Sequence, residues 1–275
     1  MPLVRMPHLS PVAALKIFFT TQALGLSLWL LRIPEVKATI GMDLIDLSLA
    51  LFMQPLGILL GFFIAPFLIQ LTGNKKSCLY FGPIFILSFI FIPIAYSFLF
   101  LATILFVSGF VCATVEVSMN AMAAKLEKES KKRMMSGFHA FWSIGALLSG
   151  IIVTIFAALS ISFLTQQISI IPLLIIVTAI VAFYLPKDTL EQDHIGKPHT
   201  KKFIPSYTII ILCITPFGAL LLEGAMMEWT AVFKGDFHNI DPTWVGLIFC
   251  TFTVVMTISR FFGDQIVDKL KVKKT

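Results

Sequence analysis

The stretch FLFLATILFVSGFVCATVEVSMNAM, residues 98–122, is apolar enough to indicate the fold class. A transmembrane helix needs about 20 consecutive, mostly apolar residues to cross ~30 Å of hydrocarbon. The stretch meets this length and carries a single charged side chain, Glu116, with Asn120 four positions later. We therefore predict a membrane-spanning helix with a carboxylate inside it.

The composition of the whole chain agrees with a membrane protein. Of 275 residues, 57% are hydrophobic and 13% are charged, which leaves too few polar side chains to cover a soluble domain. Seven further segments have the length of a span, and backbone groups in lipid must be satisfied within a helix. We predict an all-α polytopic membrane bundle with spans at residues 11–31, 44–71, 78–96, 98–122, 137–161, 168–185, 204–227 and 244–267.

The basic residues between the spans predict the orientation of the chain. Lysine and arginine cluster on the side that carries both termini, whereas the other side holds only Arg32, Lys37 and Lys234. Loops with excess positive charge stay in the cytoplasm. We therefore expect a multi-pass protein of the inner (plasma) membrane with both termini cytoplasmic. This asymmetry accounts for the net charge of +6, so no nucleic-acid partner is expected.

The polar stretch PKDTLEQDHIGKPHTKK, residues 186–202, divides the chain into two parts. Its proline, glycine and mixed charge are typical of a linker. We expect a six-helix bundle over residues 1–185, a cytoplasmic linker over 186–203 and two helices of a second, incomplete bundle over 204–275. Gly25 and Trp29 of the first span are echoed by Gly224 and Trp229 of the seventh, as in transporters built from two parallel halves.

Glu116 is the first candidate for a functional residue. It lies nine positions before Lys125, or about 13 Å along a helix from the basic boundary. An ionisable group at such depth usually faces a cavity or a partner, and Asn120 shares its helix face. One hypothesis is a proton or solute site; the alternative is a structural ion pair, for which Lys16 lies at a suitable depth.

Three other places carry polar residues inside spans. Glu223 lies deep in the seventh span and is a candidate for lining a pathway, whereas Glu228 and Trp229 lie near its outer end. His139 and Trp142 share a face at the start of the fifth span, where a proton role and interfacial anchoring both remain open. Gln22 can contact a polar solute or hydrogen-bond a neighbouring helix.

Small residues and cysteines have simpler interpretations. Gly57, Gly61 and Ala65 recur every four residues, which is typical of close helix packing. The four cysteines show no metal-binding spacing, and no nucleotide-binding or catalytic motif is present in the sequence. We therefore expect neither a metal, nor a cofactor, nor an enzyme.

Several segments together resemble the major facilitator superfamily, in particular its fucose-permease-like branch. The segments are VEVSMNA in the fourth span and FHAFWSIGALLSG in the fifth, with RIPEVKATIGMDLIDLSLALF, EGAMMEWTAVF and RFFGDQIVDKL elsewhere. The resemblance implies two six-helix bundles around a cavity lined by the first, fourth and seventh helices. It also implies proton coupling and sugar binding at Glu116 and Asn120, while Leu30 occupies the region where such permeases carry an acidic residue.

The resemblance leads to a functional hypothesis and two alternatives. We expect a secondary transporter that moves a small polar, sugar-like solute by alternating access, with proton coupling. Glu116 would be the proton-sensitive group, and Asn120, Gln22, Trp29 and Glu223 would lie along the pathway. Relative to the family the chain lacks four final spans, so we expect either a truncated, non-transporting remnant or a second chain that completes the bundle. A drug or metabolite exporter of the same fold is the other alternative.

Overall fold

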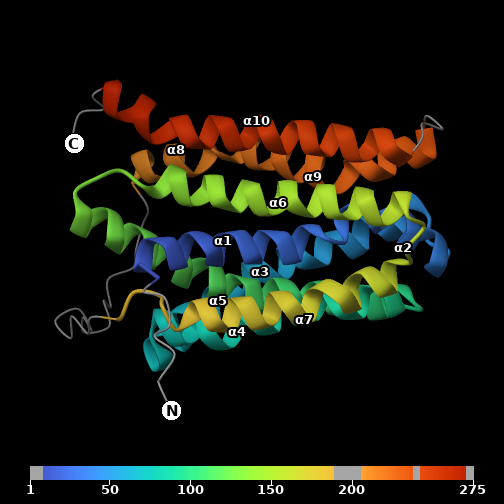
Figure 1. Ribbon diagram of the computed structural model, residues 1–275, viewed down its shortest axis with the longest axis horizontal. Helices are drawn as coiled ribbons and strands as arrows, with labels where there is room; N and C mark the ends of the chain where they lie inside the picture. The colour runs from blue at the N-terminus through green and yellow to red at the C-terminus, as the bar shows by residue number, and fades with distance from the viewer. Residues whose placement is uncertain (1–8, 189–205, 238–241, 271–275) are drawn as a thin grey trace, which may run out of the picture.

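The computed structural model describes residues 9–188, 206–237 and 242–270, and these residues are helical apart from short connections (Figure 1). The predicted all-α membrane bundle is confirmed. The α-helices and 3-10 helices (η) are α1 Pro11–Ser27, η1 Leu30–Arg32, α2 Ile33–Ile40, α3 Leu44–Thr72, α4 Asn74–Ser88, η2 Phe89–Ile94, α5 Phe98–Ser130, α6 Met135–Ala158, α7 Phe163–Ala182, α8 Tyr207–Ile214, α9 Phe217–Phe237 and α10 Pro242–Lys269.

Eight helical segments in the described residues are long and apolar enough to cross a membrane, as the sequence predicted. Three of them are interrupted. The first span leaves the α-helix after α1 and resumes in α2, where Pro34 occupies the first turn. The seventh is broken into α8 and α9 at Pro216, because proline has no backbone N–H to continue the helical hydrogen bonds. The third ends in η2, which contains Pro93.

Several span boundaries differ from the prediction: the first span runs to Ile40 rather than to residue 31, and the seventh runs to Val232 rather than to residue 227. Two further differences arise because local capping and polar surfaces extend the helices. α7 begins at Phe163 rather than at residue 168, since the Ser162 hydroxyl caps the helix and accepts a hydrogen bond from Thr165 N. α5 continues to Ser130, eight residues beyond the predicted end at 122. The last two turns of α5 are charged and lie beyond the apolar segment. A prediction from hydropathy alone therefore leaves these two turns out of the span.

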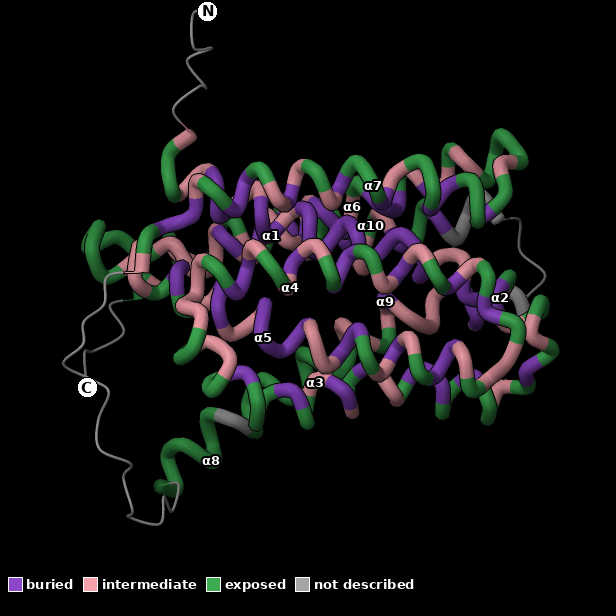
Figure 2. Tube along the Cα trace, turned by 90° about the horizontal axis from the view of Figure 1, so that it is seen from below, coloured by how far each residue is buried: buried purple, intermediate pink, exposed green. Residues whose placement is uncertain are grey.

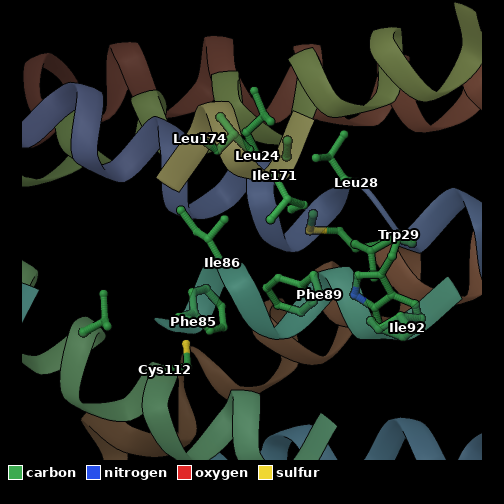
Figure 3. Packing of buried hydrophobic residues seen from close by; sticks show 14 of the residues in the cluster. Leu24, Leu28, Trp29, Phe85, Ile86, Phe89, Ile92, Cys112, Ile171 and Leu174 are labelled. Carbon is green, nitrogen blue, oxygen red and sulfur yellow. The ribbon is translucent and has the colours of Figure 1, made fainter. Parts of the chain in front are cut away.

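Close backbone contacts hold the first seven helices together. A Cβ atom added to Gly57 of α3 would lie 2.2 Å from Phe106 O of α5, and one added to Gly109 of α5 would lie 2.1 Å from Gln54 O. The predicted packing role of Gly57 and Gly61 is confirmed, because only glycine permits this approach. Figure 3 shows the apolar core, where α1, α4, α5 and α7 meet around Phe85 and Phe89.

The start of the linker is fixed to the bundle. Asp188 accepts hydrogen bonds from Asn74 N (3.0 Å) and Lys75 N (3.1 Å) at the start of α4. Gly73, just before them, has a φ of 81° and would collide with Asp188 if it carried a Cβ. The rest of the predicted linker, from residue 189, lies outside the described residues, and the three-part division of the chain stays a prediction.

The last three helices lie against one side of the bundle. α10 runs beside α6 along its length (Figure 1), and a Cβ on Gly246 of α10 would lie 2.1 Å from Thr154 Oγ1 of α6. α9 packs against η1 and α2. We call the end of the bundle where α1 begins and α10 ends the proximal end, and the end that carries η1 and α2 the distal end. Figure 2 shows that α8 is exposed at the proximal end.

Candidate transport site

Glu116 and Asn120 lie together in the middle of α5, and both are partly buried. The Asn120 side-chain amide donates to the Glu116 carboxylate (Nδ2 to Oε2, 3.0 Å) and to the Glu116 carbonyl oxygen (2.9 Å). This is the i, i+4 pairing that the sequence predicted. Among the described residues no cationic side chain forms an ion pair with this carboxylate. An amide is therefore its polar partner.

The hypothetical ion pair between Lys16 and Glu116 does not form. The Lys16 ammonium lies 4.9 Å from the ring centroid of Phe141 on α6, in a cation–π contact. Thr20, one turn further along α1, donates its hydroxyl to Phe141 O (2.9 Å). This side of α1 therefore faces α6, and depth along the helix axis did not reveal that direction.

Glu223 is paired, which the sequence reasoning did not anticipate, and its place along a pathway stays a prediction. The Arg260 guanidinium of α10 forms a bidentate ion pair with it, at 2.8 Å to Oε2 and 3.0 Å to Oε1. The same guanidinium donates to Ser143 Oγ of α6 (2.7 Å) and weakly to His139 O (3.4 Å). The sequence reasoning missed Arg260 and Ser143, although Arg260 lies nine residues inside Lys269 and its depth was a usable signal.

Glu116, Ser143 and Arg260 lie at similar depth in the bundle. Glu116 is nine residues before Lys125, Arg260 is nine before Lys269, and Ser143 is eight after Met135 at the start of α6. At 1.5 Å per residue, Glu116 lies about 14 Å from Lys125, Arg260 about 14 Å from Lys269, and Ser143 about 12 Å from Met135. The span interior therefore contains a polar layer contributed by both parts of the chain.

His139 and Trp142 are partly buried on α6. The imidazole of His139 meets the ring of Phe19 on α1 edge-on, with centroids 5.5 Å apart. Its backbone carbonyl, rather than its ring, receives the hydrogen bonds from Ser143 and Arg260. The contact with α1 is compatible with anchoring, and a proton role for His139 stays a prediction.

Gln22 and Trp29 are more fully buried than the other candidates. Gln22 is 0% exposed, and neither atom of its amide has a hydrogen-bond partner among the described residues. Trp29 is 1% exposed and packs with Phe89 and Ile92 inside the first bundle (Figure 3). Gln22 therefore has free hydrogen-bonding capacity. The indole N–H of Trp29 also has no partner among the described residues, although its ring packs in the apolar core.

Glu228 and Trp229 lie on the distal part of α9 and are partly buried. Glu228 forms no hydrogen bond or ion pair within the described ranges, and Trp229 packs against the apolar core. Because α9 contacts η1 and α2, these two residues belong to the distal contact between the two parts of the chain. They are not gathered with Glu116.

Two carboxylates cap the proximal end of α6. Glu127 of α5 accepts from Met134 N (2.7 Å) and Met135 N (2.9 Å). Asp264 of α10 accepts from Ser136 N (3.2 Å) and Gly137 N (2.9 Å). These four N–H groups would lack partners at a helix N-terminus, where negative charge is also favourable. One helix start is thus shared between the two parts of the chain.

The chemistry available to these residues is limited to proton exchange and hydrogen bonding. The described residues contain no group of three or more histidine, cysteine, aspartate or glutamate side chains placed to hold a metal ion. A partly buried carboxylate can accept a proton, and amides such as Asn120 and Gln22 can bind hydroxyl groups. Such groups suit the reversible binding of a polar solute.

Sequence comparisons identify the family. Residues 15–275 match the Major Facilitator Superfamily. The chain is 27% identical over 266 residues to an uncharacterized MFS-type transporter of Yersinia pestis, covering 96% of this chain and 68% of that protein. It is 24% identical to an uncharacterized transporter of Sinorhizobium fredii (95% of this chain, 69% of the relative) and 22% identical to the membrane protein MosC of Rhizobium meliloti (94% and 62%). The chain belongs to the major facilitator superfamily, whose members are transporters.

Proposed function

We propose that the chain belongs to a secondary transporter for a small polar, sugar-like solute and that Glu116 exchanges protons during transport. The observation that carries this proposal is the environment of Glu116. Its carboxylate lies partly buried at mid-depth in a membrane helix, with an amide partner at 3.0 Å and no ion-pair partner among the described residues. An anion at such a place is costly, and a proton or a solute can neutralise it.

Neighbouring polar groups support solute binding. Asn120 holds the carboxylate with one amide N–H and keeps further hydrogen-bonding capacity. Gln22 has an amide with no protein partner, and a buried polar group without a partner costs about 1–3 kcal/mol. A solute hydroxyl or a water molecule at Gln22 would remove that cost. These features favour hydroxyl-rich solutes over apolar ones.

The contacts between the two parts of the chain support alternating access. α6 and α10 approach closely through Gly150 and Gly246, while α9 meets η1 and α2 only near the distal end. Large apolar side chains of α8 and the first half of α9 are exposed, including Ile214 and Phe217. A rocking mechanism needs a contact of this kind, about which the two halves can turn.

We propose that the proximal end faces the cytoplasm of a cell whose inner membrane holds the protein. Lys128, Lys131, Lys132 and Arg133 are all exposed at that end, and such an excess of positive charge favours cytoplasmic placement. The exposed apolar faces of α3 and α8 suit lipid or further transmembrane helices, and the second chain expected from the sequence stays a prediction.

Reconstitution into liposomes that contain an internal pH dye tests the proposal. Addition of single pentoses and hexoses should acidify the lumen with one of them, and Glu116→Gln should abolish that acidification while Glu116→Asp retains part of it. A variant Glu116→Gln that still couples solute and proton movement would contradict the assignment. Movement of lipophilic cations instead of sugars would favour an exporter, and no movement of either would favour a remnant without transport.

A further inference from the structure

Arg260 bonds to both parts of the chain, with a charged partner in one part and a neutral partner in the other. Its Nη2 donates twice to Glu223, at 2.8 and 3.0 Å, and its Nη1 donates to Ser143 Oγ at 2.7 Å. The side chains of Arg260 and Glu223 are each 22% exposed, so the pair is mostly shielded from solvent. A guanidinium can donate hydrogen bonds to partners on two sides because its N–H donors form a rigid planar fork.

The charged and neutral partners of Arg260 lie on different sides of the interface. Glu223 lies on α9, so the ion pair stays within the last three helices, which contain α10. Across the interface, on α6, the guanidinium meets only a hydroxyl and, weakly, the carbonyl of His139. The positive charge is therefore neutralised on its own side, and the contact with α6 is a hydrogen bond to neutral groups.

This partition sets what the Arg260 guanidinium loses when α6 separates from α10, in addition to the contacts of Asp264 with the start of α6. Breaking a buried ion pair leaves an uncompensated charge and is strongly unfavourable. Breaking the bond to Ser143 leaves the ion pair intact and loses only one charge-assisted hydrogen bond. The joint is thus strong enough to bias the interface and weak enough to open.

Toward the proximal end the same interface holds further polar contacts, since Ser136 Oγ donates to Arg260 O (2.6 Å) and Asp264 caps the start of α6. Around the guanidinium itself the interface is apolar. Gly150 of α6 lies against Phe249 of α10, and Phe141 meets Phe261 with ring centroids 5.9 Å apart. Such packing resists separation but has little directionality. Ser143 also donates to His139 O (3.2 Å), one turn before it on α6. The guanidinium is therefore bonded to α6 at a defined point.

We propose that Arg260 is a positioning residue for transport: Glu223 and Arg260 form a charge-neutral unit that makes a releasable hydrogen-bonded joint with Ser143 between the two halves. The proposal rests on the alternating access proposed above. When the halves rock, the unit moves with α9 and α10, and no charge is left alone in the membrane. Ser143 decides how long the joint stays closed.

Distances between spin labels test the joint without knowledge of the solute. Labels at Lys132→Cys and Lys269→Cys, both exposed at the proximal end, report the separation of the halves in lipid nanodiscs once the four native cysteines are replaced. Ser143→Ala should raise the ratio of separated to joined populations about tenfold, the effect of losing one hydrogen bond to a charged group. Ser143→Thr keeps the hydroxyl and should restore the ratio.

Control variants separate the joint from general stability. Ser149→Ala removes a buried hydroxyl of α6 that bonds only its own helix, at Ala146 O, and should leave the ratio unchanged. Glu223→Leu combined with Arg260→Met removes both charges, so it should match Ser143→Ala in the ratio while keeping the melting temperature. Adding Ser143→Ala to that double variant should cause no further change.

Two results would overturn the proposal. One is an unchanged distance distribution in Ser143→Ala. The other is an equal effect of Ser143→Ala with and without Arg260, because the hydroxyl would then act through another contact. Since the measurement uses no solute, failure of the joint and failure of sugar uptake at Glu116 are distinguishable.

Discussion

The regions around Glu116 and around Glu223 place a carboxylate inside the membrane in opposite ways. Glu223 on α9 is neutralised by two contacts to the Arg260 guanidinium, at 2.8 and 3.0 Å. Among the described residues, Glu116 on α5 has only the amide of Asn120 as a side-chain partner, at 3.0 Å. Both carboxylates lie inside predicted spans, so we expect the partner to decide the role. A carboxylate with a fixed counter-charge stabilises helix contacts, whereas one with an amide partner stays available to a proton or a solute.

Removing each carboxylate in turn should give the largest difference in stability between the two regions. Glu223→Leu leaves the Arg260 charge without its counterion and should lower the free energy of unfolding by about 3–5 kcal/mol. Glu116→Leu strands no cation that the structure pairs with it, and it should change stability by less than about 1 kcal/mol. Denaturant or thermal unfolding in detergent measures both. Equal losses would contradict the distinction.

Removing both charges of the pair should reverse most of the first effect. Glu223→Leu with Arg260→Met replaces a mostly buried ion pair by apolar side chains, which is often neutral or stabilising. We expect the double variant to unfold within about 1 kcal/mol of the original chain. If the double variant were as unstable as Glu223→Leu alone, the pair would be serving contacts other than charge neutralisation.

Asn120→Ala tests what the hydrogen bond from Asn120 contributes at Glu116. The variant removes the only hydrogen-bond donor that the described residues offer to that carboxylate side chain. It should cost about 1 kcal/mol of stability, since both residues are partly exposed. Asn120→Asp places a second carboxylate beside the first and should disturb solute binding more than stability. Unfolding and uptake measured on the same samples separate the two effects.

Lys16→Met should have the smallest effect. The ammonium interacts with the Phe141 ring at 4.9 Å and not with Glu116, so its loss should cost about 0.5–1 kcal/mol. Proton exchange at Glu116 should be unaffected. A strong dependence of that exchange on Lys16 would instead indicate that the two groups pair in another conformation.

The sequence predicted those features of the two regions that depend on a single helix. Apolar length located eight spans, and the i, i+4 spacing placed Asn120 on the face of Glu116. Glycines four apart predicted that the second span packs closely against a neighbour, and the structure shows that this neighbour is α5. The breaks were less evident: Pro216 divides the seventh span because it lacks the N–H that would continue the helix, although the apolar run continues through it.

The parts that depend on two helices could not be predicted. Arg260 and Glu223 are 37 residues apart and Arg260 and Ser143 are 117 apart, so only the packing of α6, α9 and α10 brings them together. The failed pairing of Lys16 with Glu116 has the same cause. Helical rise gives the depth of a residue, but the neighbours of a helix decide which direction its side chain faces.

Infrared difference spectroscopy of the reconstituted chain tests the central claim most directly. The C=O stretching band of protonated carboxyl groups, followed during a pH titration in nanodiscs, counts the buried carboxyls that exchange protons. The account predicts that Glu116→Gln removes a titrating component and that Glu223→Leu with Arg260→Met leaves this component in place. Glu228→Gln is the control for a second partly buried glutamate that forms no ion pair within the described residues. A component that survives Glu116→Gln and disappears with the loss of Glu223 would contradict the account.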